Sequence, residues 1–142
     1  MAGRGHRALV TTKHFVDTHS FLWYLAGSAQ LGSAAKAVLQ DPASALFIPA
    51  TALAEACWIV ERGRVALTVT DVLTAIDNDS RITILPLDQS VIERSNGLTA
   101  IGEMHDRQIV ATALVSQDQG GTVDLLTKDG NITASGLISI VW

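Results

Sequence analysis

Short apolar runs alternate along the chain with longer segments whose apolar positions recur at helical spacing. The apolar runs predict buried strands, at residues 14–16, 45–50, 81–87, 123–127 and 136–142. The segments between them predict helices, at residues 20–26, 32–41, 51–62, 68–79, 88–96 and 105–117. Strands that alternate with helices in this way predict an α/β fold built around a mostly parallel sheet.

Small polar residues and helix breakers set the expected ends of these helices. We expect the helices to begin at Ser20, Ser33, Thr51 and Thr70. We expect them to end at Gly27, Pro42, Gly63 and Gly97. Beyond the strand at 123–127, Asp129 and Gly130 predict a turn.

Length and composition indicate one domain, part of whose apolar surface is not buried in its own core. A chain of 142 residues can enclose a substantial core, and we expect a single domain over residues 13–142 after a mobile extension over residues 1–12. Hydrophobic residues make up 48% of the chain, so we expect part of its apolar surface to meet a partner. The net charge of −4 does not by itself indicate nucleic-acid binding, which would need local basic residues or a bound cation.

The single cysteine and the hydropathy pattern bear on location. Cys57 has no partner for a disulfide within the chain, which favours a reducing compartment such as the cytoplasm. No apolar run reaches the roughly 18 residues of a membrane helix. The segment before Asp17 lacks the apolar core of a signal peptide.

Four acids fall where the predicted strands end or the following helices begin. Asp17 and Asp129 directly follow strands, and Glu55 is the only charge between Ala50 and Val60. Asp106 opens the predicted helix at 106–116, on the face that carries Val110 and Ala113. In parallel α/β sheets the carboxyl ends of the strands share one edge, so we expect all four acids to meet there.

Four carboxylates at one place repel each other, and a divalent cation would relieve the repulsion. Carboxylate oxygens suit Mg²⁺ or Mn²⁺, and the chain has no Cys/His spacing of a zinc site. Each acid also has a local explanation: Asp17 as a helix cap, Asp106 as a partner of the helix dipole, and Asp129 as a turn residue. Glu55 is harder to explain locally, because an unpaired carboxylate in an apolar helix costs free energy.

Four blocks of sequence carry a family likeness. They are "FVDTHSFLWYLAG", "IPATALAEACWIVERGRV", "MHDRQIVATAL" and "LLTKDGNI", with the terminal "ISIVW". In this order they resemble the PIN-domain ribonucleases of the VapC toxin type, whose acidic positions match Asp17, Glu55, Asp106 and Asp129. The loop "QDQGGTVD" is longer than usual in that family, which leaves Asp124 as a competitor for the place of Asp129.

The resemblance implies a fold, an activity and partners. The fold is the PIN-like three-layer α/β/α sandwich, and the activity is endoribonuclease cleavage as the toxin of a type II toxin–antitoxin system. The implied partners are an RNA substrate, a homodimer mate and a cognate antitoxin that blocks the site. A PIN-like module that binds RNA or protein without catalysis is the alternative.

We hypothesise that the four acids bind one or two Mg²⁺ or Mn²⁺ ions that activate water for phosphodiester hydrolysis. Thr18 and Thr127 are candidates for orienting a ligand or water, or else for satisfying nearby backbone groups. Arg107 and Lys128 are candidates for phosphate contacts, and a solvated surface charge is the alternative for each.

Other α/β families fit less well. A receiver domain needs an acidic pair after its first strand and a lysine after its fifth. A haloacid-type phosphatase needs Asp-x-Asp where this chain has Asp17-Thr18-His19. No GxxxxGK[ST] or GxGxxG stretch supports a nucleotide-binding loop.

Overall fold

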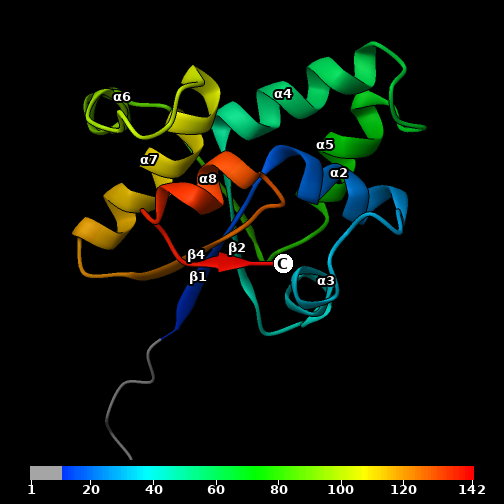
Figure 1. Cartoon of the computed structure of the whole chain (residues 1–142). Coiled ribbons are helices and arrows are strands. Elements are labelled where there is room, and N and C mark those ends of the chain that lie inside the picture. The colour runs from blue at the N-terminus through cyan, green and yellow to red at the C-terminus, as the bar shows by residue number, and fades with distance from the viewer. Residues whose placement is uncertain (1–10) are drawn as a thin grey trace, which may run out of the picture.

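The computed structural model describes residues 11–142 and places five strands and seven helices in that range (Figure 1). The strands are β1 (Thr12–Val16), β2 (Ala45–Pro49), β3 (Ile82–Leu85), β4 (Thr122–Leu126) and β5 (Ile140–Val141). The helices are α2 (Thr18–Ala26), α3 (Ser33–Gln40), α4 (Ala50–Glu61), α5 (Val69–Asp77), α6 (Gln89–Asn96), α7 (Met104–Asp118) and α8 (Gly130–Ser135). Most of the extension expected over residues 1–12 lies outside the described residues, and Thr12 already belongs to β1.

The strands form one sheet in the order β3-β2-β1-β4-β5, and every pair is parallel. The predicted α/β class is therefore confirmed. The chain builds outward from β1 through β2 to β3, then returns to add β4 and β5 on the other side of β1. This reversal creates a switch point between β1 and β4, where open α/β sheets bind their ligands.

The core lies on both faces of the sheet, as the apolar strands predict. Phe15, Leu46, Ile48 and Leu125 are almost wholly buried. The ring of Phe15 stacks on that of Phe47 in the neighbouring strand, with 5.4 Å between centroids. Helix α7 packs against β2 and β4, and α6 covers α7.

One polar pair interrupts the apolar strands. His14 on β1 lies opposite Asp124 on β4, and its Nδ1 lies 2.7 Å from Oδ1 of Asp124. The pair explains why polar residues occur in the middle of both strands. It also engages Asp124 two residues before β4 ends.

Several expected helix starts are wrong by two or three residues. Helix α2 begins at Thr18 with Asp17 as its N-cap, whereas Ser20 is buried and donates its hydroxyl to the carbonyl of Leu126. Helix α5 is capped by Thr68 and not Thr70, because Thr68 and Asp71 form a reciprocal capping box. A cap depends on which side chain reaches a free N–H, and several nearby residues share the required chemistry.

The C-terminal region differs most from expectation. After Asp129 the chain forms the short helix α8 where a turn was predicted, and β5 contains only Ile140 and Val141 of the predicted final strand. The N-cap of α3 is Gly32 and not Ser33. A Cβ atom on Gly32 would lie 2.7 Å from the backbone carbonyl carbon of Trp142. Trp142 therefore leaves room only for glycine at position 32.

Among the helices of residues 11–142, none combines the length and apolar character needed to cross a bilayer.

Candidate metal centre

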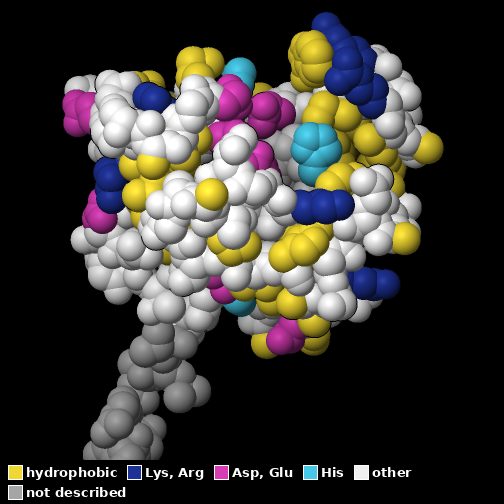
Figure 2. All heavy atoms as spheres, in the orientation of Figure 1, with side chains coloured by type: hydrophobic (Ala, Val, Ile, Leu, Met, Phe, Trp, Pro, Cys, Tyr) yellow, Lys and Arg dark blue, Asp and Glu magenta, His cyan; other side chains and the backbone are white. Residues whose placement is uncertain are grey.

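A cavity of about 400 Å³ opens at the carboxyl edge of the sheet, beside the switch point. Its lining contains all four predicted acids; the lining residues are Asp17, Thr18, His19, Trp23, Glu55, Asp106, Lys128 and Asp129. On the face shown in Figure 2, acidic side chains gather beside a hollow that histidine and hydrophobic side chains border. The structure thus brings together acids separated by up to 112 residues of sequence (129 − 17).

Asp17 is held firmly at the end of β1. Its Oδ1 accepts a hydrogen bond of 2.7 Å from the N–H of Thr18, which makes it the N-cap of α2. Its Oδ2 accepts a hydrogen bond of 2.6 Å from the hydroxyl of Thr127, which lies beyond the end of β4. Burial raises the pKa of Asp17 above its ordinary value, against the opposing effect of these hydrogen bonds. Asp17 therefore combines the local role of a cap with a place in the cavity.

Glu55 reaches the cavity from the second turn of α4. Its Oε1 accepts a hydrogen bond of 2.8 Å from the hydroxyl of Thr18, so a residue next to Asp17 also orients Glu55. Thr18 is 3% exposed, and its hydroxyl has little access to water. The hydrogen bond gives this carboxylate a partner in an otherwise apolar part of α4.

Asp106 lies in the first turn of α7 and is half-buried. Burial raises the pKa of Asp106 to about 7, and the charges of Asp129, Glu103, Asp17 and Glu55 add to the rise. The N-terminal dipole of α7 favours the carboxylate but does not offset these effects. The charges of the other acids around the cavity therefore act on Asp106, as expected where several carboxylates crowd together at a site that could hold a cation.

Asp129 caps α8 through a hydrogen bond of 2.9 Å from the N–H of Ile132 to its Oδ1. Its own N–H donates to the hydroxyl of Thr127 at 3.0 Å. Because Thr127 also donates to Asp17, one buried hydroxyl joins the acids that follow β1 and β4. Asp124, the competing candidate, is paired with His14 and does not line the cavity.

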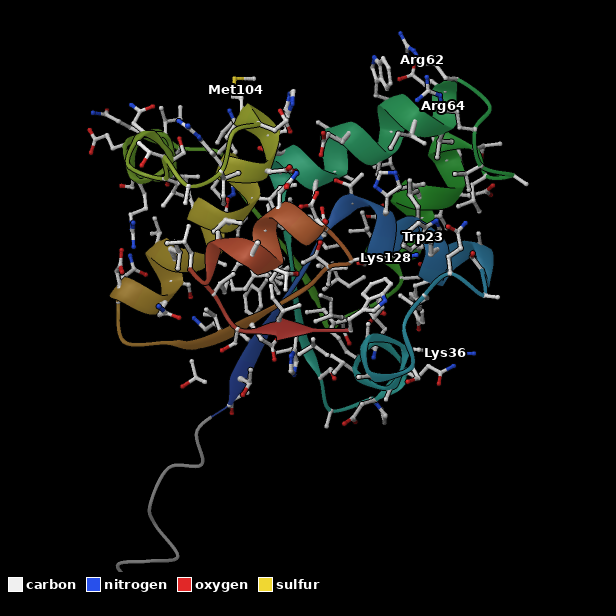
Figure 3. All side chains as sticks on the ribbon, in the orientation of Figure 1. Trp23, Lys36, Arg62, Arg64, Met104 and Lys128 are labelled. Carbon is white, nitrogen blue, oxygen red and sulfur yellow. The ribbon has the colours of Figure 1, made fainter. Side chains whose placement is uncertain are left out.

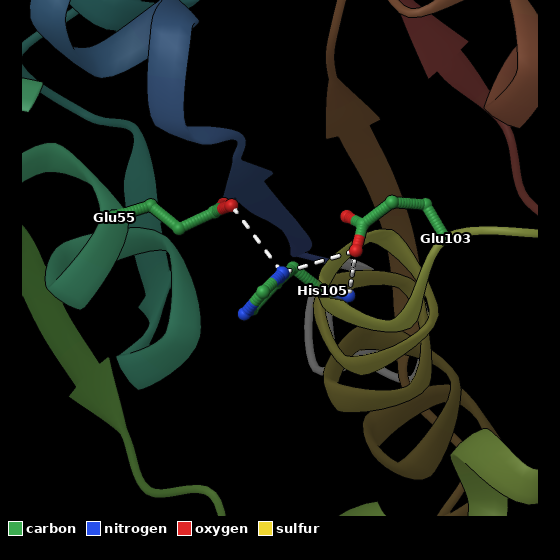
Figure 4. Close-up of side chains that lie close together, drawn as sticks. All are labelled: Glu55, Glu103 and His105. Carbon is green, nitrogen blue, oxygen red and sulfur yellow. Dashed lines mark hydrogen bonds and ion pairs between the residues drawn. The ribbon is translucent and has the colours of Figure 1, made fainter.

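The sequence did not point to Glu103, the N-cap of α7, which accepts hydrogen bonds from the N–H groups of His105 and Asp106. His105 Nδ1 lies 3.0 Å from Oε2 of Glu103 and 3.9 Å from Oε2 of Glu55 (Figure 4). Ligand atoms of these three residues lie within 4.8 Å of one another. The helix was expected to begin at residue 105 or 106, so Glu103, the first residue of "EMHD", had no assigned role.

Of the two residues predicted to contact phosphate, Lys128 lies at the cavity and Arg107 does not. Lys128 lines the cavity, and its Nζ lies 5.8 Å from the centroid of the Trp23 ring (Figure 3). Arg107 donates from Nε to the carbonyl of Ile101 and is not among the residues that line the cavity. The positive charge at this cavity therefore comes from Lys128.

The donor set fits a hard divalent cation. Asp17, Glu55, Asp106 and Asp129 offer carboxylate oxygens, and backbone and hydroxyl groups hold all of them except Asp106 in fixed orientations. Mg²⁺ and Mn²⁺ prefer such oxygen ligands, whereas zinc prefers nitrogen and sulfur. The raised pKa values of Asp17 and Asp106 show that their negative charge is poorly compensated by the protein alone.

Comparison with known families places this fold and its acids in context. Residues 14–134 match the family model of the PIN domain. The chain belongs to the PIN domain family. The matched region includes β2, β3 and β4 completely and β1 from His14 onward, and it includes all four acids of the cavity.

Solved structures share the fold of this PIN domain at low sequence identity. VapC20 of Mycobacterium tuberculosis, described as a sarcin–ricin loop cleaving toxin, superposes with a TM-score of 0.64 and 16% identity over 91% of this chain and 99% of that chain. VapBC2 of Rickettsia felis, bound to a promoter DNA fragment, superposes with a TM-score of 0.63 and 13% identity, over 90% of this chain and 96% of that chain. DNA-bound VapBC of Salmonella typhimurium also has a TM-score of 0.63 and 13% identity, over 93% of this chain and 97% of that chain. A comparison with curated proteins gives no match.

Proposed function

We propose that this PIN domain is a Mg²⁺- or Mn²⁺-dependent endoribonuclease that cleaves RNA phosphodiester bonds. The observation that carries the proposal is the convergence of Asp17, Glu55, Asp106 and Asp129 on one cavity at the switch point of the sheet. The pKa values of Asp17 and Asp106 are raised, as expected of carboxylates that crowd together where a cation would bind. Membership of the PIN domain family supports the same reading.

The four acids would hold the metal, and Thr18 and Thr127 would keep Glu55 and Asp17 in position for it. A bound divalent ion supplies Lewis acidity, a water of lowered pKa and charge stabilisation at the phosphate. Lys128 at the rim would attract and orient a phosphate of the RNA. The acids would also discourage RNA binding without a metal, because their charge repels the backbone.

We further propose that the protein is the toxin of a type II toxin–antitoxin pair, acting in the cytoplasm as a homodimer. The VapBC complexes that share its fold contain an antitoxin alongside the toxin. A cognate antitoxin would silence the chain by covering the acidic cavity. The apolar composition of the chain is consistent with burial of surface against such partners.

The decisive experiment incubates purified protein with separate tRNA, rRNA and mRNA substrates, each with Mg²⁺, with Mn²⁺ and with EDTA. We expect cleavage of at least one RNA with either metal and none with EDTA. Calorimetric titration of Mg²⁺ and Mn²⁺ runs in parallel. If metal affinity and cleavage are both absent, the chain is a PIN-like binding module and not an enzyme.

Metal affinity should depend on pH through Asp106. A carboxyl group must lose its proton to ligate a cation, and the pKa of Asp106 is about 7. Below about pH 7, each pH unit should therefore weaken Mg²⁺ binding about tenfold, with a further contribution from Asp17, whose pKa is also raised. Calorimetry between about pH 5.5 and pH 8.5 measures this dependence.

The Asp106→Asn variant is the control for the pH experiment, because it has one fewer proton to lose. Its affinity should be weaker overall and should change less steeply with pH. A wild-type affinity that stays constant below about pH 7 would contradict the assigned titration.

A further inference from the structure

A second, larger cavity of about 750 Å³ adjoins the acidic one. The two share His19 and Glu55 among their lining residues, so they lie side by side at that point. The remaining wall is mostly apolar and includes Ala54, Trp58 and Ile59 of α4 together with Leu87. The metal-centre proposal makes no use of this wall.

Trp58 is the unusual residue of this cavity. It is 48% exposed, although burial of an aromatic ring of this size would be favourable. The guanidinium carbon of Arg62 lies 3.6 Å from the ring centroid, and that of Arg64 lies 5.6 Å from it. Figure 3 shows these arginines together at the end of α4. Arg64 lines the cavity, whereas Arg62 packs on one face of the Trp58 ring. An apolar cavity is thus bordered by a partly exposed aromatic ring and by one cation, with a second cation on the ring.

The charge pattern favours an occupant that is flat, apolar in part and attached to anions. Single-stranded RNA has this chemistry, because its bases stack on aromatic rings and arginine planes while its phosphates contact cations. Leu87, at 38% exposed, adds further apolar surface to the same cavity. The cavity volume lies within the usual range of ligand sites.

Helix α4 links this cavity to the proposed metal centre. Glu55 and Trp58 are three residues apart on α4 and therefore lie on one face of it. An RNA strand whose phosphate reaches the acids would thus present a neighbouring base to Trp58. Both contacts come from one helix, which fixes their separation.

We propose that the cavity lined by Trp58 is a binding site for an unpaired base of the RNA, adjacent to the scissile phosphate. Arg62 and Arg64 would contact the phosphates that flank this base. The proposal rests on the proposed ribonuclease function for the identity of the RNA as substrate. It assigns to Trp58 a role in binding and selecting the RNA, and none in the hydrolysis itself.

The test measures binding of a fluorescein-labelled single-stranded RNA of random sequence to the cleavage-impaired Asp106→Asn protein. In this background Trp58→Ala should weaken binding about 5- to 100-fold, and Trp58→Phe should retain most of the affinity. Ile92→Ala is the control, because Ile92 is similarly exposed at 45% but lines neither cavity. Circular dichroism of each variant checks that the fold is kept.

An abasic RNA of the same length separates base stacking from phosphate contacts. Loss of the bases should weaken binding to the Asp106→Asn protein, and Trp58→Ala should cause little further loss on the abasic strand. Equal affinity of the Trp58→Ala and parent proteins, or an equal effect of Trp58→Ala on both RNAs, would overturn the proposal. The cavity would then be open to a protein partner.

Cleavage by otherwise wild-type protein distinguishes failure of this site from failure of the proposed function. Trp58→Ala should raise KM for RNA more than it lowers kcat, and should alter the pattern of cut positions in a random pool. If RNA binding depends on Trp58 but the wild type cuts no RNA, Trp58 still binds an RNA base, but that base adjoins no scissile phosphate and the ribonuclease assignment fails. If cleavage is present and both KM and the pattern ignore Trp58, only the base site fails.

Discussion

An Asp106→Asn variant should lose about 10²- to 10⁴-fold of metal-dependent RNA cleavage, yet unfold at a higher temperature than the wild type when no divalent ion is present. The loss of activity follows from removing a carboxylate ligand, since metal stabilisation of a phosphoryl transition state contributes several kcal/mol. Both outcomes come from the same crowding of charge around one side chain.

The gain in stability follows from the raised pKa of Asp106. The folded protein holds this proton more tightly than the unfolded chain, so ionisation of Asp106 opposes folding. This unfavourable contribution to folding is absent below the unfolded pKa of 3.8, grows as the pH rises and reaches its full size above about pH 7. Asparagine avoids it, and after allowance for solvent screening we expect a gain of about 1–2 kcal/mol at about pH 8.

Thermal unfolding in EDTA measures this effect, with an expected increase in Tm of about 3–5 °C at about pH 8 that disappears as the pH approaches about 4. Asp77→Asn is the control, because Asp77 is exposed at the end of α5 and does not line the acidic cavity. It should match the wild type in cleavage and differ from it in stability by no more than about 0.5 kcal/mol, through loss of a charge at the C-terminus of α5. A lower Tm for Asp106→Asn at about pH 8 would contradict the electrostatic account.

A Leu126→Ala variant should lose about 2–5 kcal/mol of unfolding free energy. Leu126 is the last residue of β4, is fully buried and pairs with Val16 and Val141 on its two sides. Truncation would leave a cavity against one face of the sheet, at the ends of the strands that lead to Asp17 and Asp129. The loss is a large share of the 5–15 kcal/mol typical of a domain.

Urea denaturation measures the loss, with Leu73→Ala as the matched control because Leu73 is 43% exposed on α5. The control should change the unfolding free energy by no more than about 0.5 kcal/mol. Similar values for the two variants would show that the switch point is not closely packed. Any cleavage that Leu126→Ala retains should require more metal, because its acids are held less firmly.

The sheet could be predicted from the sequence because parallel strands are buried on both faces and therefore appear as apolar runs such as "ALFIP". The helix starts could not be predicted as well. Ser20 and Asp17 both have capping chemistry, and only the path of the backbone after β1 decides that Asp17 serves. Helix α8 was missed because it has six residues, fewer than periodicity can reveal.

The four acids were predicted because strand ends of a parallel sheet meet at one edge, and the structure places them on one cavity. The roles of their neighbours were not predictable. The Thr127 hydroxyl accepts from the N–H of Asp129, as one of its two predicted roles required, but it also donates to Asp17, which was not predicted. That contact spans 110 residues, and no local pattern indicates it.

The packing of Trp142 has a practical consequence for fusion proteins. Its ring lies 5.9 Å from that of Trp23, which lines the acidic cavity, and its carbonyl accepts a hydrogen bond from the N–H of Ala34. Residues joined after Trp142 would start next to Gly32 and could disturb the ring contact that supports Trp23. Thr12, the first residue of β1, lies at the amino edge of the parallel sheet, opposite the cavity, so a tag on that side is the better choice for every assay above.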